Sequence, residues 1–443
     1  MNELLKTGQC VTIESSGGSC EVVQFLGGGG QGEVYRAKLG DEDLALKWYY
    51  PHAATPEQRQ ALETLVKSGP PTDKFLWPLA LAVAPAKATL PGFGYVMRLR
   101  EPRYKGIVDL MKRRIDPSFR VLATAGLQLA HSYLQLHAKG LCYRDISFGN
   151  VFFDPQTGEV LICDNDNVAV NGQALGGVLG TPRFMAPEVV CGKGLPGTET
   201  DLFSLAVLLF YVFMIHHPLE GRKEAAIKCL DLPAMNKLYG TEPVFIFDPV
   251  DRSNEPVPGC HDNATAFWPI YPKFLRDLFT RAFTVGIKDP QHGRVRESEW
   301  RAALVRLRDA IVYCAHCGGE NFYDAEALPA AGGKPAPCWS CRKEISLPYR
   351  IRIAKNVIML NHDTQLFPHH LDDQKLWDFD RPVAEVARHP TNPSVWGLKN
   401  LTPEKWVSTA ADGSVKDVEP GRSATLAAGA KINFGKTEGE VRI

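Results

Sequence analysis

A glycine-rich stretch near the start of the chain reads Gly27-Gly28-Gly29-Gly30-Gln31-Gly32-Glu33-Val34. Its spacing, Gly27-x-Gly29-x-x-Gly32, lets a backbone close over phosphate groups, because no Cβ stands in the way. Dinucleotide-binding loops share this spacing, but they require a helix directly after the loop. Here residues 33–38 lead into a Gly40-Asp41 turn and a second apolar run, which is typical of a β-hairpin. The hairpin therefore argues against a dinucleotide fold.

Further short motifs follow the glycine-rich stretch in a fixed order. They are Leu44-Ala45-Leu46-Lys47, Tyr143-Arg144-Asp145-Ile146-Ser147-Phe148-Gly149-Asn150, Asp164-Asn165-Asp166 and Ala186-Pro187-Glu188. In this order they resemble the motifs of a bacterial, eukaryotic-like (Hanks-type) serine/threonine protein kinase. The resemblance implies an α+β fold with two lobes. We expect a β-rich small lobe over residues 1–98 and an α-rich large lobe over residues 99–312.

The same resemblance implies an ATP site. The residues expected to contact ATP are Gly27, Gly29, Gly32, Val34, Ala45, Lys47, Met97 and Leu99. Lys47 would hold the α- and β-phosphates, and it needs a carboxylate partner from the small-lobe helix that we expect at residues 56–67. Glu57 and Glu63 are the candidates. We favour Glu63, because it precedes the apolar pair Leu65-Val66.

The catalytic groups implied by the resemblance are Asp145, Lys47 and Asn150, with Asn150 and Asp164 as ligands of Mg²⁺. Asp145 would orient the substrate hydroxyl toward the γ-phosphate. The chain departs from the family pattern at Tyr143, which replaces histidine, at Ser147, which replaces lysine, and at Asn165-Asp166, which replaces Phe-Gly. Asp166 could add charge near the metal, cap a turn or itself be the ligand. The spacing from the preceding strand favours Asp164 as the ligand.

The segment after the metal motif has no hydroxyl side chain from Asn165 to Gly180, and Thr181 is the first. We therefore expect that phosphorylation of this segment does not activate the protein. The resemblance also implies that Glu188 pairs with Arg294. Asp201 is expected to hydrogen-bond the backbone of the catalytic loop, residues 143–150.

Two close cysteine pairs, Cys314-x-x-Cys317 and Cys338-x-x-Cys341, stand 20 residues apart. Four thiolates on two turns can hold a tetrahedral Zn²⁺, and a site closed by four sulfurs is structural rather than catalytic. Residues 313–345 thus resemble a zinc ribbon. Free thiols are the alternative.

Residues 346–443 alternate apolar and polar side chains, which predicts strands. Three such runs, residues 383–388, 394–401 and 430–435, resemble parts of a small, degenerate forkhead-associated-like β-sandwich. The phosphothreonine contacts of that family, Gly-Arg and Ser-x-x-His, have no convincing counterparts here. We therefore expect protein docking from this domain rather than phosphopeptide binding.

Composition limits where the protein acts. The formal net charge is zero, so no overall field attracts nucleic acid or a membrane. The most apolar run, residues 202–215, is too short to span a bilayer. The chain has eleven cysteines and no basic-then-apolar N-terminal segment, so we expect a cytoplasmic protein without a disulfide framework.

These observations predict an ATP-dependent kinase that phosphorylates Ser or Thr of a partner protein in bacterial stress or signalling. The resemblance further suggests a von Willebrand A-type partner and a metal-dependent phosphatase. The main alternative is a nucleotide-binding pseudokinase that acts as a scaffold through its C-terminal modules. A small-molecule kinase of related fold is less favoured, because Gly180-Thr181-Pro182 and Ala186-Pro187-Glu188 are typical of enzymes with protein substrates.

Overall fold

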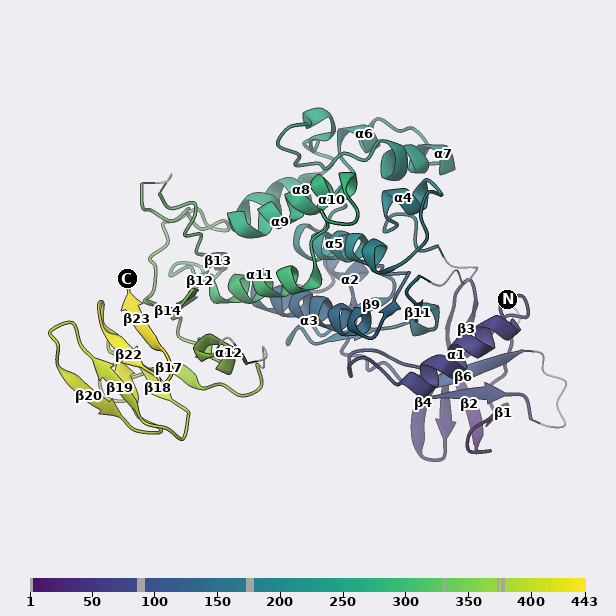
Figure 1. Cartoon of the computed structure of the whole chain (residues 1–443), viewed down its shortest axis with the longest axis horizontal. Coiled ribbons are helices and arrows are strands. Elements are labelled where there is room, and N and C mark those ends of the chain that lie inside the picture. Colours follow the sequence, from purple (N-terminus) through teal and green to yellow (C-terminus); the bar gives the residue numbers. More distant parts are fainter. Residues whose placement is uncertain (1–2, 86–91, 173–178, 330–331, 373, 376–378) are drawn as a thin grey trace. The chain divides into compact units, whose positions relative to one another are not determined.

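The computed structural model describes residues 3–85, 92–172, 179–329, 332–372, 374–375 and 379–443. The chain divides into two compact units (Figure 1). Unit 1 comprises Met1–Thr265 and Leu278–Arg301, and unit 2 comprises Ala266–Asp277 and Ala302–Ile443. The predicted limits at residues 98, 312 and 345 are not tested by this division and stay predictions.

Unit 1 begins with a closed β-barrel in the strand order β1-β2-β3-β4-β6-β5. The strands are β1 (Cys10–Ile13), β2 (Ser19–Gly28), β3 (Gly32–Leu39), β4 (Glu42–Tyr49), β5 (Ala80–Val83) and β6 (Phe93–Arg98). The predicted hairpin is β3–β4, which pairs Val34 with Lys47. The alternation along β3 and β4 buries Tyr35, Leu46 and Trp48 in the barrel core.

One helix, α1 (Pro56–Ser68), connects β4 to β5. Thr55 caps it by accepting a hydrogen bond from the Gln58 backbone N–H at 3.2 Å, and Pro56 fits the first helical position. The apolar face of α1 buries Leu62 and Leu65. This helix agrees with the prediction over residues 56–67.

The rest of unit 1 is mainly helical, with short strands next in sequence to the predicted catalytic residues. Its first elements are β7 (Lys105–Gly106), α2 (Ile107–Met111), α3 (Phe119–Ala138), β8 (Leu141–Cys142), β9 (Val151–Phe153), β10 (Val160–Ile162), η1 (Asn165–Asn167) and β11 (Ala169–Val170). They are followed by α4 (Pro187–Val190), α5 (Thr198–Met214), α6 (Arg222–Ala225), α7 (Leu232–Met235), η2 (Asn236–Thr241), η3 (Arg252–Asn254) and α8 (Asp262–Phe267). Strand pairs β9–β10 and β8–β11 are antiparallel.

Helix α5 is buried along most of its length and packs against α3, beside which it lies in Figure 1. It contains the apolar run at residues 202–215 that the sequence marks as too short for a bilayer. Burial on all sides explains why the run has no polar face. None of the helices in the described ranges is long and apolar enough to cross a membrane.

The later helices are η4 (Trp268–Ile270), α9 (Lys273–Phe283), α10 (Val285–Lys288) and α11 (Glu297–Asp309). Along the chain, the division between the two units falls within α8, within α9 and within α11. Each of these three helices therefore contributes residues to both units.

Unit 2 continues with the hairpin β12 (Ile311–Tyr313) and β13 (Glu320–Phe322) and then with two antiparallel sheets. The six-stranded sheet has the order β15-β14-β23-β22-β19-β20, from β14 (Arg350–Ile353), β15 (Asn356–Met359), β19 (Trp406–Thr409), β20 (Val415–Val418), β22 (Lys431–Asn433) and β23 (Glu438–Arg442). The four-stranded sheet has the order β16-β17-β18-β21, from β16 (Gln365–Leu366), β17 (Ala384–Arg388), β18 (Trp396–Asn400) and β21 (Ser423–Thr425). A short helix, α12 (Pro368–Leu371), follows β16.

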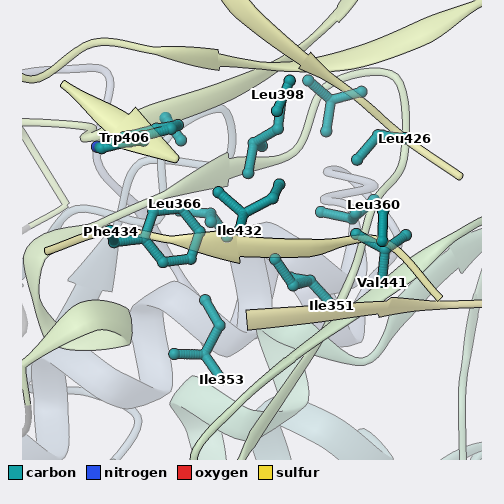
Figure 2. Packing of buried hydrophobic residues seen from close by; sticks show 14 of the residues in the cluster. Ile351, Ile353, Leu360, Leu366, Leu398, Trp406, Leu426, Ile432, Phe434 and Val441 are labelled. Carbon is teal, nitrogen blue, oxygen red and sulfur yellow. The ribbon is translucent and has the colours of Figure 1, made fainter. Parts of the chain in front are cut away.

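Both sheets contribute to one hydrophobic cluster. Figure 2 shows Ile351, Ile432 and Val441 of the six-stranded sheet near Leu366 and Leu398 of the four-stranded sheet. These side chains are fully buried. The three runs predicted as strands are β17, β18 and β22, so the prediction of a β-rich segment is confirmed.

Candidate functional site

The glycine-rich loop joins β2 to β3 in the barrel. The Gly29 backbone N–H donates to the Gly32 carbonyl at 2.9 Å and closes the loop. A side chain at Gly32 would overlap the backbone carbonyl of Trp48 on β4, so this position needs glycine for close strand approach. Gln31 reaches inward from the loop and donates from Nε2 to Asn167 Oδ1 at 3.1 Å.

Lys47 lies on β4 with its side chain only 6% exposed. Its Nζ is 2.5 Å from Asp164 Oδ1 and 2.8 Å from Asp166 Oδ2. Burial alone would lower the pKa of Lys47, but the two carboxylates outweigh burial and raise it above its usual value. The ammonium is therefore held charged in a buried site.

Glu63 does not have the place that the sequence predicted. Its carboxylate is 40% exposed and pairs with Arg59 one turn earlier on α1, at 3.2 Å. The α1 residue that reaches the site is Gln58, whose Nε2 donates to the Tyr49 hydroxyl at 3.2 Å and to the Asp166 carbonyl at 3.1 Å. The positions of the two residues on α1 explain this difference. Gln58 lies in the first turn of α1, beside η1, so its side chain can contact Asp166. Glu63 lies on the solvent side of the helix, next to Arg59.

Asp164 directly precedes the turn η1, Asp166 lies within it, and the two carboxylates have different surroundings. Asp164 has a left-handed backbone (φ 55°), its side chain is 34% exposed, and it accepts from Asn167 Nδ2 at 3.3 Å. Burial and the charge of Asp166 raise the pKa of Asp164 to about 6. The Asp166 side chain is fully buried, and although burial opposes it, Lys47 holds the pKa of Asp166 below its usual range.

The predicted catalytic residue Asp145 is held between two neighbours. Its Oδ1 accepts from the Thr181 hydroxyl at 2.8 Å, and its Oδ2 accepts from Asn150 Nδ2 at 3.0 Å. Burial raises the pKa of Asp145. These contacts fix the direction of the carboxylate before any substrate arrives, which is what positioning requires.

Asp201 at the start of α5 binds the backbone of the predicted catalytic loop. It accepts hydrogen bonds from the backbone N–H groups of Tyr143 at 2.5 Å and Arg144 at 2.9 Å. Its other partner is His137 Nε2 at 3.1 Å, and His137 Nδ1 contacts Glu297. The predicted contact between Asp201 and the loop backbone is confirmed.

The ion pair predicted between Glu188 and Arg294 is present. Arg294 donates through Nη2 to both oxygens of Glu188, at 2.7 and 2.8 Å. The arginine side chain is only 2% exposed. This pair connects the Ala-Pro-Glu motif at α4 to the segment before α11, as the sequence predicted.

Apolar side chains of β3, β4 and β6 belong to one hydrophobic cluster. Ala45 pairs with Met97 across β4 and β6. The expected ATP contacts Val34, Ala45, Met97 and Leu99 share one cluster with residues that the sequence analysis missed, including Leu161, Phe152 and Cys163. Phe152 lies two residues after Asn150, and Cys163 directly precedes Asp164. Their closeness in sequence to these two predicted site residues is the signal that could have identified them.

Other residues missed by sequence reasoning are polar. They are Gln31, Tyr49, Gln58 and Asn167. Each is an uncharged side chain whose contacts depend on distant parts of the chain, so no local pattern identifies it. The expected segment without hydroxyl groups lies partly outside the described residues, at residues 173–178.

The four cysteines of unit 2 come together. Their Sγ atoms lie within 4.8 Å of one another, with Cys314–Cys341 at 3.6 Å and Cys317–Cys338 at 3.7 Å. Tetrahedral zinc with bonds of about 2.3 Å requires sulfur–sulfur separations of roughly 3.8 Å, so the donor set fits Zn²⁺. Although burial opposes it, backbone N–H donors, with that of Cys341 first, lower the pKa of the Cys338 thiol to about 6, which favours the ligating thiolate.

Comparison with known proteins agrees with this geometry. Residues 104–267 match the family described as "Protein kinase domain". A probable serine/threonine-protein kinase of Zea mays is 33% identical over 115 residues, which are 25% of this chain and 18% of the relative. A cell cycle serine/threonine-protein kinase of Saccharomyces cerevisiae is 29% identical over 144 residues, 28% of this chain and 19% of the relative.

A bacterial relative covers more of the chain. The DNA damage-responsive serine/threonine-protein kinase RqkA of Deinococcus radiodurans is 27% identical over 217 residues, which are 47% of this chain and 32% of the relative. The matches thus cover between 18% and 32% of the lengths of these three relatives. Residues 104–267 are thus similar to a protein kinase domain, and this part of the chain has mixed α and β content.

Proposed function

We propose that this chain, in which residues 104–267 match a protein kinase domain, transfers the γ-phosphate of ATP to a Ser or Thr hydroxyl of a protein. The observation that carries the proposal is the setting of Asp145, held by Thr181 and Asn150. A carboxylate fixed in this way can accept a hydrogen bond from a hydroxyl and aim its oxygen at a phosphorus atom. The serine/threonine kinase relatives support the same reaction.

The remaining site residues have the roles that the family resemblance assigns to them. Gly27, Gly29 and Gly32 would cover the phosphates, and Val34, Ala45, Met97 and Leu99 would enclose the adenine. Lys47, held charged by its carboxylate neighbours, would bind the α- and β-phosphate oxygens. Asp145 would position the attacking hydroxyl and receive its proton as the bond to phosphorus forms.

Asp164 and Asn150 fit the ligand set for Mg²⁺. Mg²⁺ prefers carboxylate and amide oxygens, and Asp164 offers a partly exposed carboxylate. Asn150 uses its amide nitrogen for Asp145, which keeps its oxygen as a donor to a cation. When bound, the cation neutralises charge on the phosphate oxygens.

Labelled-ATP transfer to the protein itself and to generic acceptor proteins tests this function. Wild type should label, whereas Asp145→Asn and Asp164→Asn should each label at least about 100-fold less. Equal labelling in all three proteins would reject the kinase reaction. Nucleotide binding without labelling by the wild type would support the pseudokinase scaffold instead.

The proposal extends to the cysteine cluster and the two-sheet segment of unit 2, and to the partners and location of the protein. The four cysteines would hold a structural Zn²⁺ in a ribbon, and the two-sheet segment would act as a forkhead-associated-like docking domain. A protein substrate follows from the kinase domain, while a von Willebrand A-type partner and a metal-dependent phosphatase rest on family analogy alone. The bacterial relative named for its response to DNA damage supports a bacterial stress role, and the cytoplasm fits the free cysteines of unit 1.

A further inference from the structure

The metal motif of this chain carries two carboxylates, and only one of them faces the open side of the site. Asp164 is 34% exposed, whereas the Asp166 side chain is fully buried. A buried carboxylate is costly unless it is paired and hydrogen-bonded. The contacts of Asp166 therefore indicate what holds it there.

Asp166 has three partners from the small lobe. Its carboxylate oxygens lie 2.8 and 3.0 Å from Lys47 Nζ, and the Tyr49 hydroxyl donates to Oδ2. Its backbone carbonyl accepts from Gln58 Nε2 at 3.1 Å. Lys47 and Tyr49 lie on β4, so Asp166 joins η1 to that strand.

Helix α1 supplies no carboxylate to this lysine. It has two acidic residues, Glu57 and Glu63. Glu57 lies in the first turn, where its own backbone N–H and the Thr55 hydroxyl lower its pKa. Glu63 pairs with Arg59. The residue of α1 that faces the site is the neutral Gln58.

We propose that Asp166 is the positioning residue that anchors Lys47 for phosphate binding, while Asp164 remains the metal ligand. The inference rests on the proposed function. Asp166 takes the part that the sequence assigned to Glu63. The two carboxylates differ in exposure, and this difference suits two roles. The partly exposed Asp164 can bind a cation, while the buried Asp166 stays paired with Lys47.

The Lys47–Asp166 ion pair does not depend on the position of helix α1. In this arrangement the lysine–carboxylate pair joins β4 to η1, and α1 contacts it through the Gln58 amide. A shift of α1 would thus break hydrogen bonds to Tyr49 and Asp166 but would not remove the charge partner of Lys47. The ion pair is formed without a helix movement.

Matched carboxylate-to-amide changes in the full-length chain test the proposal. Asp166→Asn should lower kcat for phosphate transfer by at least about 30-fold, with a change of less than about tenfold in the KM for ATP. Glu63→Gln removes the same charge from α1 and should change kcat by less than about twofold. Thermal unfolding of both variants checks that they fold.

Tyr49→Phe is a second variant that keeps the charges and removes one hydrogen bond to Asp166. It should lower kcat by about fivefold, since the carboxylate loses a partner that orients it. If Glu63 were the anchor, this hydroxyl would have no effect on kcat. An unchanged kcat in Tyr49→Phe would therefore contradict the inference even if Asp166→Asn does not fold.

Chemical modification of Lys47 gives a readout that needs no catalysis. Without nucleotide, the rate at which an amine-reactive reagent labels Lys47, followed by mass spectrometry, should rise about tenfold or more in Asp166→Asn and stay within about twofold in Glu63→Gln. The opposite order would overturn the inference. Failure of wild type to transfer phosphate, with the expected labelling order, would reject the proposed function alone.

Discussion

At the scale of single residues, the site depends on a few charged groups in buried surroundings. Lys47 and Asp166 form one such pair, and His137 with Asp201 and Glu297 forms another. Buried charges of this kind cost free energy unless each finds a partner of the opposite sign. Their contacts can therefore be tested one residue at a time.

His137 should make the stability of the protein depend on pH. Burial alone would lower the pKa of His137, but Asp201 and Glu297 raise it from 6.5 to about 9 in the folded protein. Because the folded pKa lies above the unfolded value, this stabilisation is complete below pH 6.5 and is lost as pH rises through 9. It amounts to roughly 3 kcal/mol of unfolding free energy.

Denaturant unfolding of wild type and His137→Gln at several pH values measures this effect. The difference in unfolding free energy should be largest near pH 6 and should shrink toward pH 10. His292→Gln, at a position where the side chain is 80% exposed, is the control and should follow wild type. A difference that grows with pH would contradict the assignment.

Gly32 should tolerate no side chain. In Gly32→Ala the new methyl group would overlap the Trp48 carbonyl, so β3 and β4 must separate, at a cost of about 2 kcal/mol or more. Gly30→Ala is the matched control, because a Cβ there has nothing within 4 Å. The thermal midpoint should fall for Gly32→Ala and stay near wild type for Gly30→Ala; equal midpoints would show that the strands can adjust.

At the scale of elements, helices and strands hold the motifs in register. Asp201 at the start of α5 fixes the backbone of the catalytic loop, and the Glu188–Arg294 pair fixes α4. Residues 104–267, which match the kinase family, contain the Asp145 and Asp164 motifs but not the glycine-rich loop. The glycine-rich loop and Lys47 both lie outside the matched residues. The structure shows that they are neighbours, because the pairing of β3 with β4 brings the loop beside Lys47.

Glu188→Gln should destabilise unit 1. The change leaves the buried guanidinium of Arg294 without its carboxylate, which costs about 2–4 kcal/mol. Asp277→Asn breaks the Lys273–Asp277 pair, in which both side chains are more than half exposed, and should leave the unfolding midpoint unchanged. Equal effects of the two variants in chemical denaturation would contradict the importance of burial for this pair.

At the scale of the whole molecule, the chain separates its two kinds of chemistry. The residues of the candidate ATP site belong to unit 1, and the four cysteines belong to unit 2. Each unit has a hydrophobic cluster of its own, in the barrel and between the two sheets. The proposed zinc and the proposed nucleotide should therefore depend on different residues.

Loss of the proposed zinc site should leave ATP binding intact. Cys338→Ser should remove bound zinc from the purified full-length chain, as measured by elemental analysis, because one of four thiolates is gone. The dissociation constant for ATP should change by less than about threefold, since the binding residues lie in unit 1. Cys260→Ser, at an exposed cysteine of unit 1, is the control and should retain zinc. Zinc retained by Cys338→Ser would reject the four-cysteine site.

The sequence by itself determined the order of the motifs, the β-hairpin after the glycine-rich loop, the helix at residues 56–67 and the pairing of Glu188 with Arg294. These features follow from local spacing, from periodicity and from the family resemblance. The partner of Lys47 was decided only by the tertiary structure. Glu63 and Asp166 are both carboxylates, and no pattern ranks them, because an ion pair depends on which side chain is buried beside the lysine. Chain folding puts Asp166 there, at 2.8 Å, and leaves Glu63 near Arg59 in solvent.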